Sequence, residues 1–430
     1  MKRKSSFYKA LATLVLSLGI LSMTQASWAA DQKTLERMER LIMQQQEQIE
    51  AQAKAIEGLK RQVEGLSEAQ KKASTQPAVA ATQPGPVVKS GNDKVSVKLY
   101  GQVNRGALYA DDGDKGRWNF VDNDNSSTRI GLIGTANPMA EVSLGTRFEV
   151  EFQSNPSNEV NQLDDNGVGD NNFKQRHFDI FLDSERFGKL SLGQGSTASD
   201  GTAEVDLSGT DVVGYSSIAD MAGGFYFWDK TSNGLSSTQI GNVFTNMDGL
   251  GRDDRLRYDS PNFRGFAASA SVVSGNAADL ALRYSAEIGE TKLAAAAAYS
   301  DPAGNSTTVD STVDGSVSLI HSCGFNATLA VGSQDMKVSG RDDGSFFYAK
   351  LGYRHGFFPI GETALALDYA LNEDIGQNGD EADSIGLHAV QYIDNWATEY
   401  YLGFRYHNLD RNNTDYDSIN AVLTGFRVKF

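Results

Sequence analysis

The residue types that most often carry out chemistry are few and scattered in this sequence. The five histidines stand at positions 177, 321, 355, 388 and 407, and the single cysteine is Cys323. The sequence contains no His-Glu-x-x-His pair, Gly-x-Ser-x-Gly elbow, P-loop or Gly-x-Gly-x-x-Gly motif. One cysteine excludes a disulfide framework and a multi-cysteine metal site. We therefore expect no catalytic residue, no metal site and no cofactor, and we look for function in the charged residues.

Several arginines are spaced so that they would share the inner face of a wall. Arg255 and Arg257 are two residues apart, so a β-strand would put both on one face, with Leu256 and Tyr258 on the other. Arg129 is likewise followed by an apolar residue that would face the other way. If the apolar faces contact lipid, these arginines point into a polar interior. Guanidinium groups suit such a place because they stay charged even when other cations crowd them.

A long segment between two predicted strands is rich in acidic residues. Residues 196–252 contain Glu204, Asp206, Asp211 and Asp220, followed by an aromatic run at 225–228. Acidic and basic walls that face each other across a narrow waist create a transverse field, which favours small charged or dipolar solutes. The alternative is that these are ordinary strand and loop charges.

Composition restricts the classes of protein that could carry such an arrangement. The 430 residues include 39 Lys and Arg against 55 Asp and Glu, which gives a net charge of −16. This acidic balance argues against a nucleic-acid partner, which needs an excess of basic residues. The sequence has no run of 18 apolar residues, so a helical membrane protein is disfavoured, whereas a transmembrane β-barrel needs no such run.

Residues 1–29 are predicted to be a signal peptide. Four basic residues among the first nine precede an apolar stretch at 10–20 that is too short to span a bilayer. The small residues at 26–30 favour cleavage after Ala29. Cleavage removes four positive charges and no acids, so the net charge changes from −16 to −20.

Residues 30–72 are predicted to form a coiled coil. Apolar residues recur with a seven-residue period, which gives an a/d seam over more than four heptads. The seam consists of Leu35, Met38, Ile42, Ile49, Ile56, Leu59, Val63 and Leu66. Such a narrow stripe implies self-association, although a single amphipathic helix lying on a domain surface stays open as an alternative. The pattern does not decide between two strands and three.

A linker rich in Ala, Thr, Gln and Pro, at 73–93, separates this segment from a long alternating region at 94–430. Period-two alternation with turn clusters between the segments predicts sixteen β-strands. They are expected near 94–110, 126–136, 140–153, 173–183, 188–195, 253–259, 263–273, 279–288, 291–300, 312–321, 325–334, 345–354, 362–371, 383–392, 397–408 and 418–430. Short turns on one side and long loops on the other would fit a transmembrane barrel. A soluble β-sandwich or solenoid is the alternative.

Four stretches carry a family resemblance through their order and spacing: Leu99–Gln102, 126–135, 176–194 and 255–266. They resemble the first strand, the second strand, the strand pair before the constriction loop, and the strand and turn after it, in Gram-negative outer-membrane porins. The predicted coiled coil departs from the commonest porins. It is similar to the N-terminal extensions of coiled-coil-bearing trimeric porins, which include phosphate-specific and dicarboxylate-type channels.

The resemblance implies an all-β fold: a sixteen-stranded antiparallel transmembrane β-barrel over 94–430, in a homotrimer. It implies that a constriction loop at about 196–228 folds into the barrel and presents the acids Glu204, Asp206 and Asp211. It also implies a basic wall opposite that loop, formed by Arg129, Arg176, Arg255 and Arg257. The C-terminal residues that resemble the family's barrel-assembly signal are Phe426, Val428 and Phe430. By alternation His177 would face away from Arg176, as an interface or girdle residue.

The predicted function is a water-filled channel of the bacterial outer membrane for passive diffusion of ions and small hydrophilic solutes, with the coiled coil in the periplasm. The expected partners are further copies of the chain, outer-membrane lipid and lipopolysaccharide, the barrel-assembly machinery and, through the coiled coil, peptidoglycan. The net charge of −20 favours cations. Calcium could bind at the Asp- and Asn-rich stretches 122–125, 161–172 and 411–417. Alternatives are a tether between outer membrane and cell wall, and a barrel hydrolase, for which no Ser/His pair stands out.

Overall fold

The computed structural model describes residues 94–139, 141–165 and 173–430. All of them belong to one compact unit, Pro86–Phe430. The predicted signal peptide, coiled coil and linker, with every residue of the heptad seam, lie outside the described residues and stay predictions.

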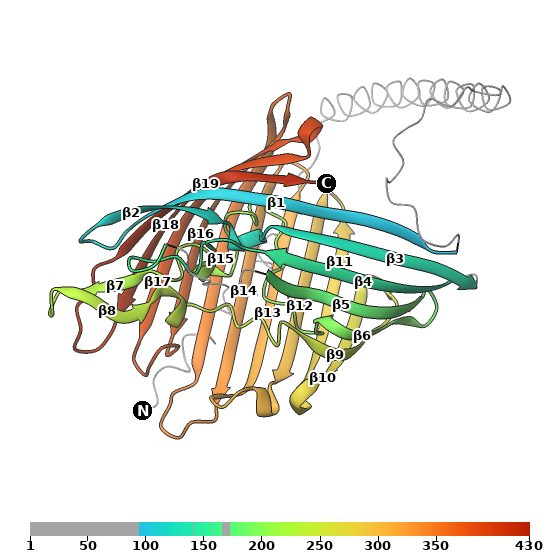
Figure 1. The fold of residues 1–430 in the computed structure, drawn as a ribbon, viewed down its shortest axis with the longest axis horizontal. Helices are drawn as coiled ribbons and strands as arrows, with labels where there is room; N and C mark the ends of the chain where they lie inside the picture. The colour runs from blue at the N-terminus through green and yellow to red at the C-terminus, as the bar shows by residue number, and fades with distance from the viewer. Residues whose placement is uncertain (1–93, 140, 166–172) are drawn as a thin grey trace, which may run out of the picture. The chain divides into compact units, whose positions relative to one another are not determined.

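Sixteen antiparallel strands form a closed barrel (Figure 1). The barrel closes because β1 (Ser96–Asp111) pairs with β19 (Ile419–Lys429) along one edge and with β3 (Arg129–Met139) along the other. The remaining barrel strands are β4 (Val142–Phe152), β5 (Phe173–Ser184), β6 (Gly188–Ser196), β9 (Arg252–Asp259), β10 (Phe266–Val273), β11 (Ala278–Ile288), β12 (Thr291–Asp301), β13 (Val309–His321), β14 (Phe325–Met336), β15 (Gly344–Phe358), β16 (Gly361–Glu373), β17 (Glu381–Ile393) and β18 (Thr398–Asp410). The prediction of a sixteen-stranded antiparallel barrel is thus confirmed.

Each of the sixteen predicted segments overlaps one barrel strand, including the small-residue segments at 263–273 and 291–300. The structure adds three short strands: β2 (Gly116–Asp122), β7 (Tyr226–Asp229) and β8 (Gly234–Gln239). β2 pairs with the second half of β1, and β3 pairs with its first half. β7 and β8 form a separate hairpin. These strands escaped prediction because they are short, with seven, four and six residues.

The two ends of the barrel differ in their connections. At one end, here called the turn side, strands are joined by short turns such as 289–290 and 322–324. At the other end, the loop side, the longest connections are 112–128, 153–172 and 197–251. Within the described ranges, no helix is both long and apolar enough to cross a membrane.

The two faces of the barrel wall follow the alternation in the sequence. On β9, Leu256 and Tyr258 are exposed at 46% and 43% on the outer face, whereas Arg255 is only 5% exposed and points inward. The outer face is therefore apolar and the inner face polar, as the bilayer requires of a barrel wall.

Residues 197–251, here called the long loop, fold into the barrel and build a hydrophobic core there. Val212, Val213 and Phe225 of the long loop share one buried cluster with Tyr348 of β15 and Leu423 of β19. The loop then forms the β7–β8 hairpin, where Lys230 donates its backbone N–H to the Asp415 carbonyl at 2.9 Å. Apolar packing thus fills the interior beside β14–β19.

Candidate functional site

Two polar cavities lie inside the barrel. The loop-side cavity, of about 530 Å³, is lined by residues such as Asp124, Gln153 and Lys174, which stand at the loop-side ends of their strands or in the loops. The turn-side cavity, of about 490 Å³, is lined by Tyr100 and Phe430, near the turn-side ends of β1 and β19. The two cavities therefore follow each other along the barrel axis.

Three arginines belong to both cavities: Arg129, Arg176 and Arg252. They come from β3, β5 and β9, three strands on the same side of the barrel. A solute that passes from one cavity to the other must pass these guanidinium groups. We call this position the arginine waist.

The arginines of the waist have different partners. Arg176 binds two carboxylates of β4, with its Nε 2.8 Å from Glu149 and its Nη1 2.7 Å from Glu151. Arg129 donates to the neutral hydroxyl of Ser126 at 3.3 Å. The positive charge of Arg176 is therefore largely balanced, whereas that of Arg129 stays available to a passing anion.

A β-bulge turns two consecutive residues of β5 into the lumen. Glu149 of β4 pairs with His177, and the next residue, Val150, pairs with Gln175, so that Arg176 is the extra residue of the bulge. Both Arg176 and His177 line the turn-side cavity. The prediction that His177 faces away from Arg176 was wrong, because a bulge breaks strict alternation and re-aims a side chain.

The long loop supplies acids to the loop-side cavity. Two of the predicted acids, Glu204 and Asp211, line it, together with Asp200 and Asp220. Two effects raise the pKa of Asp220 to about 8: chiefly the burial of its carboxyl group, and secondly the charge of the Asp124 carboxylate. Burial and the neighbouring acids Asp248, Asp220 and Asp200 likewise raise the pKa of Glu204 well above its usual value. The acidic side of the site is thus only partly ionised at neutral pH.

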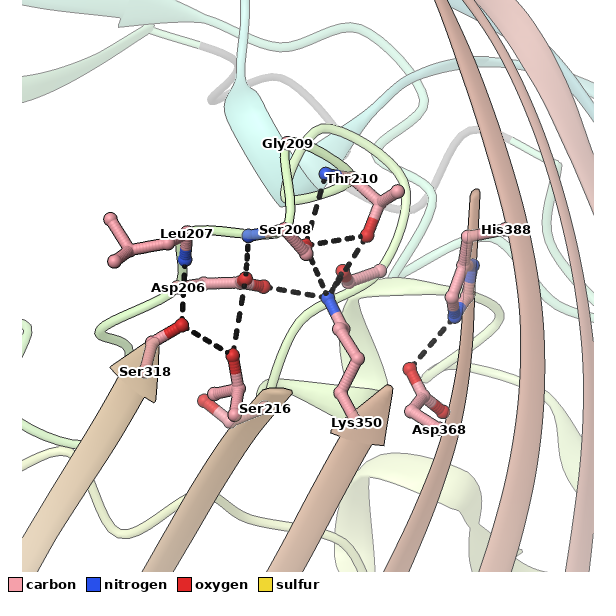
Figure 2. A network of polar contacts seen from close by, with 12 residues as sticks. Asp206, Leu207, Ser208, Gly209, Thr210, Ser216, Ser318, Lys350, Asp368 and His388 are labelled. Atoms are coloured by element: carbon pink, nitrogen blue, oxygen red, sulfur yellow. Dashed lines mark hydrogen bonds and ion pairs between the residues drawn. The ribbon is translucent and has the colours of Figure 1, made fainter. Parts of the chain in front are cut away.

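Asp206 has a different position, because it binds the barrel wall. Its carboxylate lies 2.6 Å from the Nζ of Lys350 on β15, and both side chains are almost fully buried. The same ammonium group donates to the hydroxyls of Ser208 and Thr210 (Figure 2). It also donates to the Gly214 carbonyl. Lys350 therefore holds one turn of the long loop against the wall.

Serine hydroxyls of β13 hold the backbone of the same loop. Ser316 and Ser318 each accept a backbone N–H of the loop, from Val205 and Leu207, at 2.9 Å. Further along the wall, Tyr392 of β17 donates its hydroxyl to the Gly209 carbonyl. These contacts satisfy backbone groups of a segment without secondary structure, so they fix its path.

The predicted arginines of β9 anchor the start of the loop. Arg255 is buried against Asp179 at 2.6 Å and donates to the Ser196 carbonyl. Arg257 pairs with Asp259 at 2.6 Å and also donates to the carbonyl of Thr197. Both point inward, as alternation predicted, but they hold the strand-to-loop junction rather than line either cavity.

Five basic residues of the two cavities were not predicted: Arg147, Lys174, Arg252, Arg427 and Lys429. Alternation places Arg252 on the outer face, opposite Arg255. It enters the lumen because it is the first residue of β9, directly after the left-handed Gly251, and it pairs with Asp200 at 3.4 Å. The other four stand on barrel strands, and nothing in the sequence singled them out.

The C-terminal residues Phe426, Val428 and Phe430 are exposed on the outer face, at 53%, 43% and 60%. The last residue also helps to close the barrel, because Gly101 and Phe430 exchange backbone hydrogen bonds of 2.9 and 3.0 Å. In the part of the chain that the structure describes, no group of three His, Cys, Asp or Glu side chains could hold a metal ion.

Sequence comparison extends these observations. Residues 70–413 match the family model of Gram-negative porins. The chain belongs to the Gram-negative porin family. No curated protein sequence matches this porin significantly.

Solved structures share the fold of this porin. The anion-selective porin from Comamonas acidovorans aligns with a TM-score of 0.52 and 18% identity, over 78% of this chain and 100% of that one. The outer-membrane protein OmpT of Vibrio cholerae and the outer-membrane channel DcaP of Acinetobacter baumannii each align with a TM-score of 0.51 and 14% sequence identity. Each alignment of these two covers 80% of this chain and 100% of the other. At such identities the likeness concerns the fold alone.

The family and the barrel place this porin in the outer membrane. Outer-membrane barrels have short periplasmic turns and longer extracellular loops. The loop side of the porin is therefore extracellular, and its turn side is periplasmic.

Proposed function

We propose that this porin forms a water-filled channel through which ions and small hydrophilic solutes diffuse passively, with the arginine waist as its filter. The observation that carries the proposal is the pair of polar cavities that meet at Arg129, Arg176 and Arg252. The acids of the long loop line the loop-side cavity together with these arginines, so a solute at the waist experiences charges of both signs.

The residues that line the two cavities include equal numbers of basic and acidic side chains. Their seven bases are Arg129, Arg147, Lys174, Arg176, Arg252, Arg427 and Lys429. Their seven acids are Asp124, Glu149, Glu151, Asp200, Glu204, Asp211 and Asp220. The negative net charge of the chain therefore lies away from the filter. The preference for cations that the net charge predicts stays a prediction, and the lining supports weak selectivity for small dipolar and charged solutes.

We further propose that the channel is a homotrimer whose coiled coil lies in the periplasm. The trimer form in which OmpT of Vibrio cholerae was solved supports this assembly. Lipopolysaccharide, the barrel-assembly machinery and peptidoglycan are the partners proposed for the outer wall, the C-terminal strand and the coiled coil.

Planar-bilayer recording of the purified native oligomer tests the proposal. We expect conductance steps that close in threes, and a small reversal potential in a salt gradient. Correctly folded, heat-modifiable protein that conducts no current would contradict the channel. It would favour a tether between outer membrane and cell wall, and the next question would be what the coiled coil binds.

A further inference from the structure

The charges that line the two cavities are distributed unevenly along the barrel axis. The loop-side cavity has two bases that the turn-side cavity lacks, Lys174 and Arg427. It has six acids that the turn-side cavity lacks: Asp124, Glu151, Asp200, Glu204, Asp211 and Asp220. The extracellular part of the path is therefore acidic.

The side chains of the waist and of the turn-side cavity are mostly basic. The turn-side cavity is lined by the three arginines of the waist and by Arg147 and Lys429, against the single acid Glu149. A solute that enters from the extracellular side thus meets carboxylates first and guanidinium groups second.

Ion pairs reduce the difference in charge between the two cavities but do not reverse its sign. On the basic side, Arg176 is balanced by the β4 carboxylates, and Lys429 lies 2.5 Å from Glu399. Arg147 pairs with Glu149 at 3.0 Å, and Arg252 pairs with Asp200 at 3.4 Å. Arg129 keeps a neutral partner, Ser126. On the acidic side, Asp220 accepts hydrogen bonds from the neutral hydroxyls of Tyr215 and Ser217.

Among the described residues, Glu204 and Asp211 of the long loop also have no basic ion-pair partner. Glu204 accepts a hydrogen bond from the neutral amide of Asn246, and the Asp211 side chain is exposed to the lumen. Because the pKa values of Glu204 and Asp220 are raised, the uncompensated negative charge of the long loop is carried by Asp211 and by the ionised fraction of these two acids. The uncompensated positive charge at the waist is that of Arg129.

We infer that this axial step from acidic to basic makes the pore a rectifier, which conducts better when the loop side is electrically positive. The inference rests on the proposed channel function. Fixed charges of one sign concentrate mobile ions of the other sign. The acidic region therefore holds cations and the basic region holds anions.

The direction of the applied field decides whether the junction fills or empties. A positive potential on the loop side drives cations inward through the acidic region and draws anions from the turn side through the basic region. Both kinds of ion then accumulate at the waist, and the conductance is high. The reverse potential removes both from the waist, and the conductance falls. Because the Debye length is about 10 Å at 0.1 M salt and about 3 Å at 1 M, the asymmetry fades as salt is raised.

Single-channel recording of the full-length oligomer in symmetric KCl tests the inference. At 0.1 M KCl we expect currents at equal and opposite voltages to differ about twofold, and at 1 M to become nearly equal. Because insertion can occur either way, the records should fall into two mirror-image groups. Cys323 is exposed at a turn-side connection, so a bulky thiol-reactive polymer added to one compartment labels only channels whose turn side faces it.

Charge-removing variants identify the source of the asymmetry. Arg129→Gln combined with Arg252→Gln removes the basic half of the step, and Asp124→Asn combined with Asp211→Asn removes part of the acidic half. The arginine pair should bring the current ratio close to one, and the aspartate pair should lower it. Lys292→Gln is the matched control, because Lys292 is 67% exposed and pairs with Glu287 at 3.4 Å outside both cavities. It should leave the ratio unchanged.

The outcomes separate the inference from the channel function. Oligomers that conduct equally in both directions at 0.1 M KCl would overturn the rectifier and leave the channel intact. A current ratio that stays unchanged in both double variants would also overturn the rectifier. So would a larger current at the opposite polarity in channels of known orientation. Folded oligomers that conduct no current would overturn the channel, and the rectifier with it.

Discussion

The Nζ of Lys350 lies 2.6 Å from the carboxylate of Asp206, and both side chains are almost completely buried inside the barrel. The two residues are 144 positions apart, one on the barrel wall and one on the long loop. This ion pair sets how far the first half of the loop can move from β15, and so where the loop presents its other acids.

Removing one partner of this pair should loosen the loop. Lys350→Met leaves the Asp206 carboxylate buried without its cation, a change that costs about 3–5 kcal/mol in buried pairs. We expect a lower midpoint in urea unfolding in detergent and noisier single-channel currents. Lys350→Met combined with Asp206→Asn should recover much of the loss, since no uncompensated charge remains. A single variant as stable and quiet as the native protein would show that the pair does not hold the loop.

Neutralising the waist should change both conductance and selectivity. With Arg129→Gln and Arg176→Gln together, we expect a wider waist, a higher conductance and a stronger preference for cations. In a tenfold salt gradient the reversal potential should move toward the cation limit by on the order of 10 mV, out of an ideal limit of about 59 mV. The Lys292→Gln variant should not move it. Unchanged conductance and reversal potential in the double variant would contradict the assignment of the waist.

The selectivity should depend on pH through the loop acids. Because the pKa of Asp220 is raised to about 8, this side chain is mostly protonated at pH 6 and mostly ionised at pH 9. Raising the pH across this interval adds negative charge to the loop-side cavity, so the preference for cations should increase. Reversal potentials measured at pH 6, 7.5 and 9 check this. In Asp220→Asn the change should be clearly smaller, and an equal change there would assign the titration to another group.

The bulge in β5 can be tested with cysteines introduced into a Cys323→Ser background. His177 lines the turn-side cavity, whereas the next residue, Phe178, is 61% exposed on the outer face. A small charged thiol reagent should reach His177→Cys at least about ten times faster than Phe178→Cys, because charged groups partition poorly into the hydrocarbon region. Faster labelling at position 178 would contradict the bulge and would support strict alternation along β5.

The sequence by itself determined the barrel wall. Alternation is a local property, because successive side chains of a strand point to opposite faces. It therefore located all sixteen barrel strands and the inward direction of Arg129, Arg255 and Arg257. The resemblance of the neighbouring stretches to porins also predicted that the first part of 196–252 folds into the barrel.

Only the tertiary structure decided which of these charges line the path of a solute. Asp206 and Asp211 are equivalent in sequence, yet Asp206 meets Lys350 on a distant strand while Asp211 lines the loop-side cavity. A bulge sends His177 into the lumen, and the end of β9 brings Arg252 to the waist. These positions follow from contacts between segments far apart in the chain and from local breaks in the strand pattern. The periodicity of a single segment gives no information about contacts with distant segments or about local breaks in the strand pattern.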